Sequence, residues 1–225
     1  MINAPDISVV IPVHNAERFL GEAVASVLAQ KGFSKEIILV DNNSTDRSRE
    51  VAESLEGPII VTSESQPGAG AARNCGVSLA TGRYLAFLDA DDLWLAGKVE
   101  KQVRALSAGN QLSFTYAREF PDERYTGSPC RSEPYPFLAP STFLALRSTV
   151  LRLGPLPEIP GGEFIAWYGW AQALGMKTSM ITEVCAMRRV HENNSSRSQA
   201  VMGSYPQAAK WVLERRRQAQ QTPAA

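Results

Sequence analysis

Short apolar runs alternate with segments of helical periodicity along the first hundred residues of the chain. Four of the runs are almost continuously apolar, which is typical of strands buried on both faces of a parallel sheet; they span residues 7–12, 36–41, 59–61 and 84–88. Apolar residues recur at helical spacing between them, most clearly over 19–30, and Asn15 is the expected N-cap of that helix. This order predicts an α/β fold: a single domain with a mostly parallel, twisted sheet and helices on both of its faces.

The pattern beyond residue 92 is more varied. It predicts a helix over 93–107, a strand over 112–116, a further strand over 142–146, a short helix over 147–153, an aromatic helix over 164–174, one or two strands over 178–190 and a last helix over 205–218. Residues 118–140 contain prolines, charges and aromatics without a clear period, which favours a loop or hairpin over the site. No internal repeat and no linker divides the sequence.

A glycine-rich turn over residues 66–74 leads into a helix of small side chains, which must pack closely against a neighbouring element. Its Gly68-Ala69-Gly70 resembles half of a dinucleotide-binding fingerprint. That fingerprint follows the first strand, however, and here the first strand is followed by Val13-His14-Asn15. The P-loop pattern, GxxxxGK followed by Ser or Thr, is also absent. The sequence therefore argues against both of these nucleotide sites.

Composition and charge narrow the class of protein. The chain has 225 residues, 44% of them hydrophobic, which is enough for one domain with a sizeable core. Lys+Arg and Asp+Glu both number 23, so no net positive charge indicates nucleic acid as a partner. The three cysteines are far apart and form no CxxC, which favours a reducing compartment, and we expect a cytoplasmic protein.

The sequence shows no targeting or membrane segment. The first apolar run, residues 7–13, is short and lacks the basic flank and cleavage site of a signal peptide. No stretch approaches the roughly 18 apolar residues that a membrane span needs, so we expect no transmembrane span. The three arginines at 215–217 suit either a solvated final helix or a peripheral contact with anionic lipid.

Three carboxylates follow the fourth apolar run within four residues: Asp89, Asp91 and Asp92. Ligands of open α/β sheets bind outside the carboxyl ends of the strands, so these acids stand where a site is expected. Crowded carboxylates repel one another, and a divalent cation relieves the repulsion. Mg²⁺ or Mn²⁺ takes one or two protein carboxylates and completes its shell with substrate phosphates and water. The alternative is a solvated acidic turn that caps the next helix.

Asp41 ends the second apolar run and is expected at the same edge of the sheet. Its carboxylate can accept a hydrogen bond from the ring N–H of uracil, thymine or guanine, which cytosine and adenine do not offer at the equivalent nitrogen. Asp89 can hold ribose hydroxyls, and Asp91 can hold a metal on a diphosphate. A nucleoside diphosphate fits this series of groups. Taken alone, Asp41 is better explained as an acid that forms the turn before Asn42.

Four segments resemble glycosyltransferase family 2, whose members have the GT-A nucleotide-diphospho-sugar fold. They are VVIPVHN (residues 9–15), ILVDNNSTD (38–46), GAARNCG (70–76) and YLAFLDADD (84–92). Any one of them is weak evidence, but all four occur in the order of the family and span roughly the first hundred residues.

The resemblance implies roles for the matching residues. The nucleotide pocket would be lined by Pro12, Val13, His14, Asn15 and Glu17, with Asp41 on the base, most often uracil, and Arg73 on the wall near the phosphates or the acids. Asp89, Ala90 and Asp91 would form the DxD motif, with Asp89 on the ribose and Asp91 on Mn²⁺ or Mg²⁺. His191, in a segment similar to the family's R-x-H-x-x-N, would face the metal or the diphosphate. The alternatives are a first-turn acid for Glu17, a helix-surface ion pair for Arg73 and a strand-end surface residue for His191.

The sequence departs from the family where a catalytic base is expected. Many members have a Glu-Asp pair that opens a helix, and its Asp is the base; here Glu163 is present but Phe164 occupies the Asp position. An inverting transfer needs the acceptor hydroxyl deprotonated as it attacks. Glu163 is our candidate, and the alternatives are Asp92, Glu158 or an acceptor that ionises easily. The aromatic residues that follow suit either core packing or a wall for a sugar or apolar acceptor.

These observations predict a metal-dependent, inverting glycosyltransferase that moves a sugar from a nucleotide diphosphate donor, expected to be a UDP-sugar, to an unidentified acceptor. Residues 1–225 would form one domain, with a nucleotide-binding half over about 1–110, an acceptor half over about 111–204 and a C-terminal helix and tail over 205–225. The alternative is a degenerate nucleotide-sugar-binding protein without turnover. A nucleotidyltransferase is disfavoured because no basic, glycine-rich loop follows the first strand.

Overall fold

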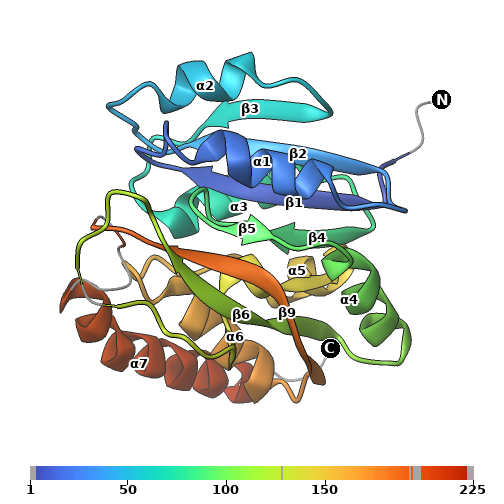
Figure 1. Cartoon of the computed structure of the whole chain (residues 1–225). Helices are drawn as coiled ribbons and strands as arrows, with labels where there is room; N and C mark the ends of the chain where they lie inside the picture. The colour runs from blue at the N-terminus through green and yellow to red at the C-terminus, as the bar shows by residue number, and fades with distance from the viewer. Residues whose placement is uncertain (1–3, 128, 193, 195–198, 222–225) are drawn as a thin grey trace.

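One mixed sheet runs through the computed structural model, which describes residues 4–127, 129–192, 194 and 199–221 (Figure 1). Within these residues the sheet has nine strands: β1 (Ile7–Val13), β2 (Lys35–Asp41), β3 (Ile59–Ser63), β4 (Tyr84–Phe87), β5 (Leu93–Trp94), β6 (Leu112–Pro121), β7 (Tyr135–Pro136), β8 (Leu144–Leu146) and β9 (Thr178–Val190). Their order is β3-β2-β1-β4-β8-β6-β9-β5, and β7 pairs with β6.

The first four strands are parallel, as the alternating pattern predicts. β1 lies between β2 and β4, and β3 pairs with the outer side of β2. Helices cross between them on either face, so both faces of these strands are buried and their apolar runs are nearly continuous. The register sets Val13 opposite Asp41, which brings the carboxyl ends of β1 and β2 to one edge.

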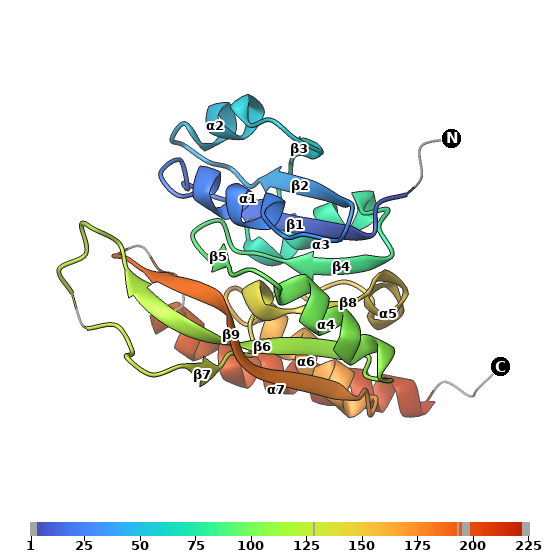
Figure 2. The ribbon, with the colours of Figure 1, turned by 45° about the vertical axis from the view of Figure 1, so that its right-hand side comes forward.

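The second half of the sheet is mixed, and it corrects two details of the prediction (Figure 2). The predicted helix over 93–107 begins only at Lys98, because residues 93–94 instead form β5, which pairs with β9. β6 continues through 118–121, where the charges favoured a loop, because it pairs there with the end of β9. The rest of the irregular stretch contains the short β7, which makes an antiparallel hairpin with β6, in line with the hairpin alternative.

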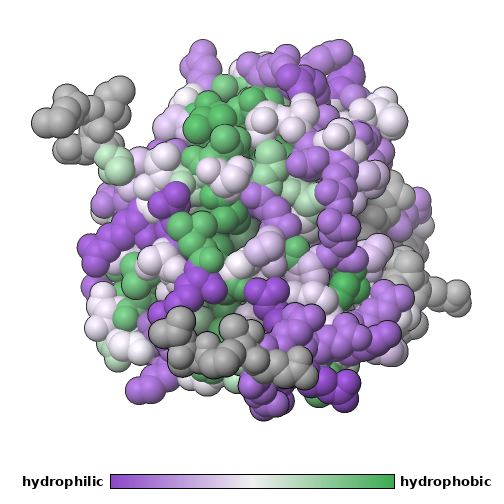
Figure 3. All heavy atoms as spheres, turned by 180° about the vertical axis from the view of Figure 1, so that it is seen from behind, coloured by the Kyte–Doolittle hydropathy of each residue, from purple (hydrophilic) through white to green (hydrophobic). Residues whose placement is uncertain are grey.

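Helices cover both faces of the sheet, as predicted. α1 (Leu20–Leu28), α2 (Ser48–Ser54) and α4 (Lys98–Ser107) contribute to the core on one face. α3 (Ala69–Leu79), α5 (Arg147–Leu153) and α6 (Glu163–Ala173) contribute to the core on the other, and α7 (Gln199–Gln221) packs against α6. Between β7 and β8 lies the 3-10 helix η1 (Pro140–Thr142). Figure 3 shows the molecule from behind: hydrophobic residues gather in a band down its middle, and hydrophilic residues surround them. No helix in the described part of the chain is both long and apolar enough to cross a bilayer.

The small-residue helix packs closely, as its sequence predicts. α3 lies against β1, and a Cβ added to Gly76 would come within 2.3 Å of Val10 Cγ1. Only glycine therefore allows this spacing between the helix and the sheet. This close packing places the start of α3, and with it Arg73, at the carboxyl edge of the strands.

Lys98 of α4 is an ionisable residue inside the core. Its side chain is fully buried, its Nζ donates a hydrogen bond to Gln102 Oε1 at 2.6 Å, and it lies 4.0 Å from the centroid of the Trp94 ring. Burial lowers the pKa of Lys98 to about 7. Between that pKa and the higher pKa of an unfolded lysine, the unfolded state binds more protons than the folded state, so stability rises with pH.

We expect the free energy of unfolding to rise by about 2 kcal/mol between pH 7 and pH 9 through Lys98 alone. Lys98→Met removes the titrating group, so its stability should change less over this range. Urea unfolding at a series of pH values measures both proteins, with Lys210→Met, on the exposed face of α7, as the control. Equal pH dependence in wild type and Lys98→Met would show that Lys98 does not titrate in this range.

Candidate active site

The site lies at the edge where β1, β2 and β4 end. Asp41 is the last residue of β2, and its Oδ1 is buried without a hydrogen-bond partner among the described residues. A buried acceptor without a donor costs free energy unless a ligand supplies the donor. Pro12 is half-buried in β1, and the side chain of Val13 packs into the core, so only its backbone can face a ligand.

His14 and Asn42 connect the ends of the first two strands to α3. His14 Nδ1 lies 2.7 Å from the Asn42 carbonyl oxygen, and because that oxygen only accepts, Nδ1 carries the proton. The Asn42 side chain donates to the carbonyls of Glu64 and Gln66, and its Oδ1 accepts from the Gly68 N–H at 2.7 Å. His14 is exposed and directly follows Val13, which lies opposite Asp41 in the pairing of β1 with β2.

Asn15 and Glu17 hold the loop after β2, and the predicted N-cap is wrong. α1 begins at Leu20, while Asn15 adopts a left-handed conformation with φ 50°. Asn15 Oδ1 accepts from the Thr45 N–H at 2.8 Å, and Glu17 Oε2 accepts from the Arg47 N–H at 2.9 Å. Asparagine tolerates positive φ and satisfies turn amides, so it suits this loop as well as a helix start. That both residues line a nucleotide pocket stays a prediction.

Arg73 of α3 joins two carboxylates that are far apart in the sequence. Its guanidinium is 4% exposed; one terminal NH₂ donates to Asp89 Oδ1 at 2.6 Å and the other to Glu163 Oε1 at 2.8 Å. Burial by itself lowers the pKa of Arg73, but the two carboxylates outweigh it and raise the pKa above its ordinary value. The predicted position of Arg73 near the acids agrees with this geometry, and the surface ion-pair alternative is wrong.

Asp92 fixes the acidic turn after β4. It is buried, its Oδ2 accepts from the Ser141 hydroxyl at 2.6 Å, and its Oδ1 accepts from the Arg189 N–H at 3.0 Å. Ser141 Oγ in turn accepts from the Asp89 N–H at 3.1 Å. Burial raises the pKa of Asp92 well above its usual range, and the charges of Asp91 and Asp89 add to the rise. Burial also raises the pKa of Asp89, although Arg73 opposes it.

Asp91 faces the end of β9. Its Oδ2 lies 2.9 Å from His191 Nε2 and accepts from Asn194 Nδ2 at 3.2 Å. His191, Asp91 and Asn194 therefore lie together, and that His191 faces a metal or a diphosphate stays a prediction. Asn193 of the segment, and Ser195 after it, lie outside the described residues. Ala90, between the two acids, is buried. The carboxylate and imidazole are suitable ligands for Mn²⁺ or Mg²⁺, but the described residues form no cluster of three such groups, so a metal would need further ligands from a bound diphosphate.

Arg189 stabilises the position of Asp91, a role that the sequence did not reveal. Its Nε donates to the Asp91 carbonyl at 3.0 Å, and its terminal NH₂ donates to Glu22 Oε2 on α1 at 2.5 Å. The guanidinium lies 4.8 Å from the Phe19 ring centroid and 4.6 Å from that of Phe120. In the sequence, only its place in the R-x-H-x-x-N segment pointed to Arg189 as a site residue, because its partners lie on distant elements.

Glu163 lies at the start of α6 beside α3. It is 8% exposed as a residue, and its side chain packs so closely to α3 that a Cβ on Gly70 would lie 3.1 Å from Glu163 Cγ. The next residue, Phe164, points into the core, with its ring centroid 5.7 Å from that of Phe143 and 5.8 Å from that of Trp167. Trp167 and Trp170 are buried too. Phe164 and Trp167 therefore pack in the core, and the alternative of an aromatic wall is wrong for these two, whereas Trp170 also lines a cavity beside α7.

The other candidate bases differ sharply in access. Asp92 is buried with both oxygens engaged, so it does not suit an exchange of protons with a substrate. Glu158 is exposed on the loop before α6. Of these three acids, Glu163 is the one that forms an ion pair with Arg73 among the described residues.

The family model and the curated relatives that match this chain both belong to glycosyltransferases. Residues 8–150 match the model of the family described as Glycosyl transferase family 2. Among curated relatives, the chain is 38% identical over 112 residues to the UDP-Glc:alpha-D-GlcNAc-diphosphoundecaprenol beta-1,3-glucosyltransferase WfgD of Escherichia coli, an alignment that covers 49% of the chain and 44% of the relative. It is 27% identical over 202 residues to WfaP of the same species, which bears the same activity name, covering 84% and 79%.

Solved structures resemble the fold over nearly the whole chain. TarS 1–349 of S. aureus in complex with UDP-GlcNAc matches with a TM-score of 0.73 and 16% identity, covering 92% of the chain and 66% of TarS. The mannosyltransferase PcManGT of Pyrobaculum calidifontis, in complex with GDP-Man and Mn²⁺, matches with a TM-score of 0.70 and 18% identity, covering 93% and 65%. The chain thus spans only part of the length of several of these proteins.

Proposed function

The chain belongs to glycosyl transferase family 2, and from this premise we propose that it transfers a sugar from a UDP-sugar to an acceptor, with inversion at the sugar carbon and with a bound Mn²⁺ or Mg²⁺. The family and the GT-A-type α/β fold are those that the sequence predicts. The observation that carries the proposal is the unpartnered oxygen of Asp41 at the same sheet edge as Asp89 and Asp91.

The donor would lie along this edge. Asp41 would accept the ring N–H of uracil, and Asp89, oriented by Arg73, would accept ribose hydroxyls. Asp91 and His191 would hold the metal through their oxygen and nitrogen atoms. A metal bound there neutralises the negative charge that develops on the diphosphate as it leaves. In this assignment about 1–110 would be the nucleotide-binding half, about 111–204 the acceptor half and 205–225 the C-terminal helix and tail; the helix itself begins at Gln199, before the predicted residue 205.

Glu163 would take the proton of the attacking hydroxyl. Arg73 occupies Oε1, which leaves Oε2 for the proton, and the ion pair fixes the orientation of the carboxyl group. The acceptor oxygen forms the new bond to the sugar carbon as the bond to the diphosphate breaks, and that electron pair leaves with UDP. A single displacement of this kind inverts the configuration at the sugar carbon.

Nucleotide binding tests the role of Asp41. We expect wild type to bind UDP at least about tenfold more tightly than CDP in calorimetric titration with Mn²⁺, because cytosine has no ring N–H to donate. Asp41→Asn should weaken UDP binding about tenfold. It should also reduce the preference for UDP over CDP, since an amide NH₂ can donate to the ring nitrogen of cytosine. Asn43→Asp, on the exposed turn nearby, is the control. An unchanged UDP-to-CDP ratio in Asp41→Asn would remove Asp41 from the base site.

A further inference from the structure

Phe19, which directly precedes α1, is buried outside the hydrophobic core. It is 8% exposed, yet among the described residues it belongs neither to the core on either face of the sheet nor to the two smaller apolar clusters. The guanidinium carbons of Arg18 and Arg189 each lie 4.8 Å from the centroid of its ring. The imidazole of His191 lies 5.0 Å from that centroid, at an angle of 37°. Apolar packing alone therefore does not explain this phenylalanine.

Other elements hold both of the arginines that contact Phe19. One NH₂ of Arg18 donates to the two carboxylate oxygens of Asp122, at 3.0 and 2.9 Å, and Arg189 forms its ion pair with Glu22 on α1. An aromatic ring attracts a guanidinium group, more strongly where water is excluded from the contact. Because both cations are held, the ring of Phe19 has a defined position before any ligand binds.

The contacts of Phe19 lead back to His191 through the end of the sheet. Asp122 directly follows β6, and its N–H donates to the Val190 carbonyl at 2.9 Å. Val190 is the last residue of β9 and is bonded to His191. The chain of contacts from Phe19 through Arg18, Asp122 and Val190 to His191 is therefore closed by the contact between the two rings. It connects the loop after β1 to the residue that is expected at the metal.

An imidazole that binds a metal needs its ring held in one orientation. The ring turns about the bond that joins it to Cβ, and the groups around a metal ligand set both its orientation and its affinity. His191 Nε2 lies 2.9 Å from Asp91 Oδ2, and the same imidazole lies against the ring of Phe19. Together these two contacts restrict the direction in which the ring nitrogen points.

We propose that Phe19 is a positioning residue for the metal site: its ring orients the His191 imidazole toward a divalent cation beside Asp91. The inference rests on the proposed metal-dependent function, which supplies Mn²⁺ or Mg²⁺ as the ligand. Phe19 itself would touch neither the metal nor the base. Its loss should therefore raise the metal concentration that UDP binding needs and leave binding without metal unchanged.

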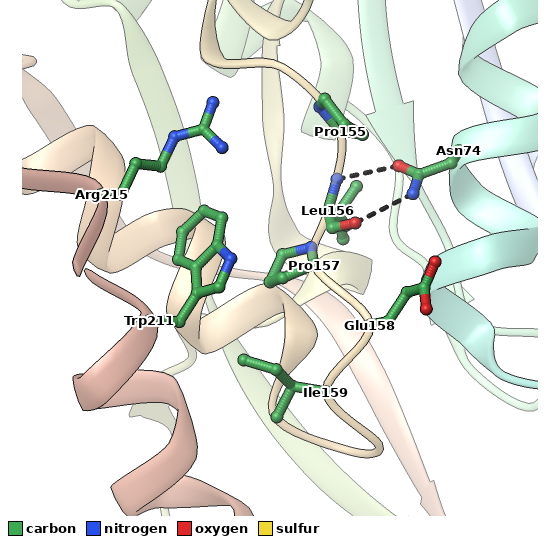
Figure 4. Close-up of a pocket in the computed structure, with 8 residues that line it drawn as sticks. All are labelled: Asn74, Pro155, Leu156, Pro157, Glu158, Ile159, Trp211 and Arg215. Atoms are coloured by element: carbon green, nitrogen blue, oxygen red, sulfur yellow. Dashed lines mark hydrogen bonds between the residues drawn. The ribbon is translucent and has the colours of Figure 1, made fainter. Parts of the chain in front are cut away.

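A second stacked arginine provides a matched control. The guanidinium carbon of Arg215 on α7 lies 5.2 Å from the ring centroid of Trp170 and 5.0 Å from that of Trp211. Figure 4 shows Arg215 and Trp211 together on one side of a cavity, and Asp91 and His191 are not among the residues that line it. Trp211→Leu thus removes an aromatic ring from an arginine outside the proposed metal site.

Calorimetric titration of UDP at a series of Mn²⁺ concentrations tests the proposal. We expect Phe19→Leu to raise the Mn²⁺ concentration for half-maximal binding about tenfold, the usual effect of losing a group that supports a metal ligand, and to leave UDP binding in EDTA unchanged. Phe19→Tyr keeps the ring and should behave like wild type. Trp211→Leu should also keep the Mn²⁺ dependence of wild type.

Histidine NMR gives a second readout, which needs no nucleotide. The chain has two histidines, His14 and His191, so His14→Gln assigns the imidazole resonances. The nearby aromatic ring shifts the imidazole protons of His191, and Phe19→Leu should move them toward the values of an exposed histidine. Bound Mn²⁺ broadens the resonances of a nearby imidazole. Phe19→Leu should need about tenfold more Mn²⁺ than wild type for the same broadening of His191.

Three results would overturn the proposal: equal Mn²⁺ dependence of wild type and Phe19→Leu, a Phe19→Tyr variant that behaves like Phe19→Leu, or no broadening of His191 by Mn²⁺ in wild type. If Phe19→Leu fails to fold, Arg18→Gln replaces it with the same expected direction, because the Arg18 side chain is 39% exposed and holds the same ring. Failure of wild type to bind UDP contradicts the proposed function instead, and the broadening of His191 by Mn²⁺ alone then still decides the role of Phe19.

Discussion

Asp91→Asn is expected to weaken Mn²⁺-dependent UDP binding at least about 100-fold, because it removes the anionic ligand that would hold the metal on the diphosphate. The variant keeps the size of the side chain and one oxygen that can still accept from His191 Nε2 and Asn194 Nδ2, so the turn should persist. Calorimetric titration of UDP with Mn²⁺ and with EDTA measures the effect in both proteins.

Two controls make the result specific. Glu50→Gln removes an exposed carboxylate from α2 and should leave UDP binding unchanged. The melting temperature of Asp91→Asn should stay within a few degrees of wild type, because Asp91 is partly exposed. If Asp91→Asn binds UDP with Mn²⁺ as tightly as wild type does, Asp91 is not a metal ligand.

Glu163→Gln is expected to lower kcat by about 10²–10⁴-fold while UDP binding stays within threefold of wild type. Glutamine keeps an oxygen that can accept from Arg73, so Asp89 should remain oriented, but an amide cannot take the proton of the acceptor. Release of UDP from a UDP-sugar in the presence of an acceptor measures kcat once a working acceptor is found.

Glu158→Gln is the matched comparison for Glu163→Gln. If Glu163 is the base, Glu158→Gln keeps most of the activity, since Glu158 is exposed and makes no ion pair in the described part of the chain. The reverse pattern would transfer the base role to Glu158. Full activity in both variants would favour an acceptor that ionises without a base. If the wild type binds UDP but turns over no acceptor, the alternative of a nucleotide-sugar-binding protein without turnover is favoured.

The parallel half of the fold is predictable because its signal is local. Strands buried on both faces are continuously apolar, and the helices between them are long enough to show their period. β5 is not predictable, because two residues, Leu93 and Trp94, are too few to show a period and become a strand only by pairing with β9. The extension of β6 through 118–121 likewise depends on its pairing with β9.

The candidate site is likewise predictable from the sequence only where its signal is local. Asp41, Asp89 and Asp91 are visible in the sequence because all three stand at, or shortly after, the end of an apolar run. The contacts that orient them join elements far apart in the chain: Arg73 with Glu163, Ser141 with Asp92, and Arg189 with Glu22. No local pattern encodes such pairs. Phe164 illustrates the limit, because its position implied a missing base, and only the packing shows that its side chain belongs to the core.

A crystal structure with UDP and Mn²⁺, in which the anomalous signal of manganese locates the metal, tests the central claim most directly. We expect manganese within ligand distance of Asp91 and His191, the uracil ring N–H on Asp41, and the ribose on Asp89. Manganese or uracil bound away from these residues would contradict it, even if the protein proves to transfer a sugar.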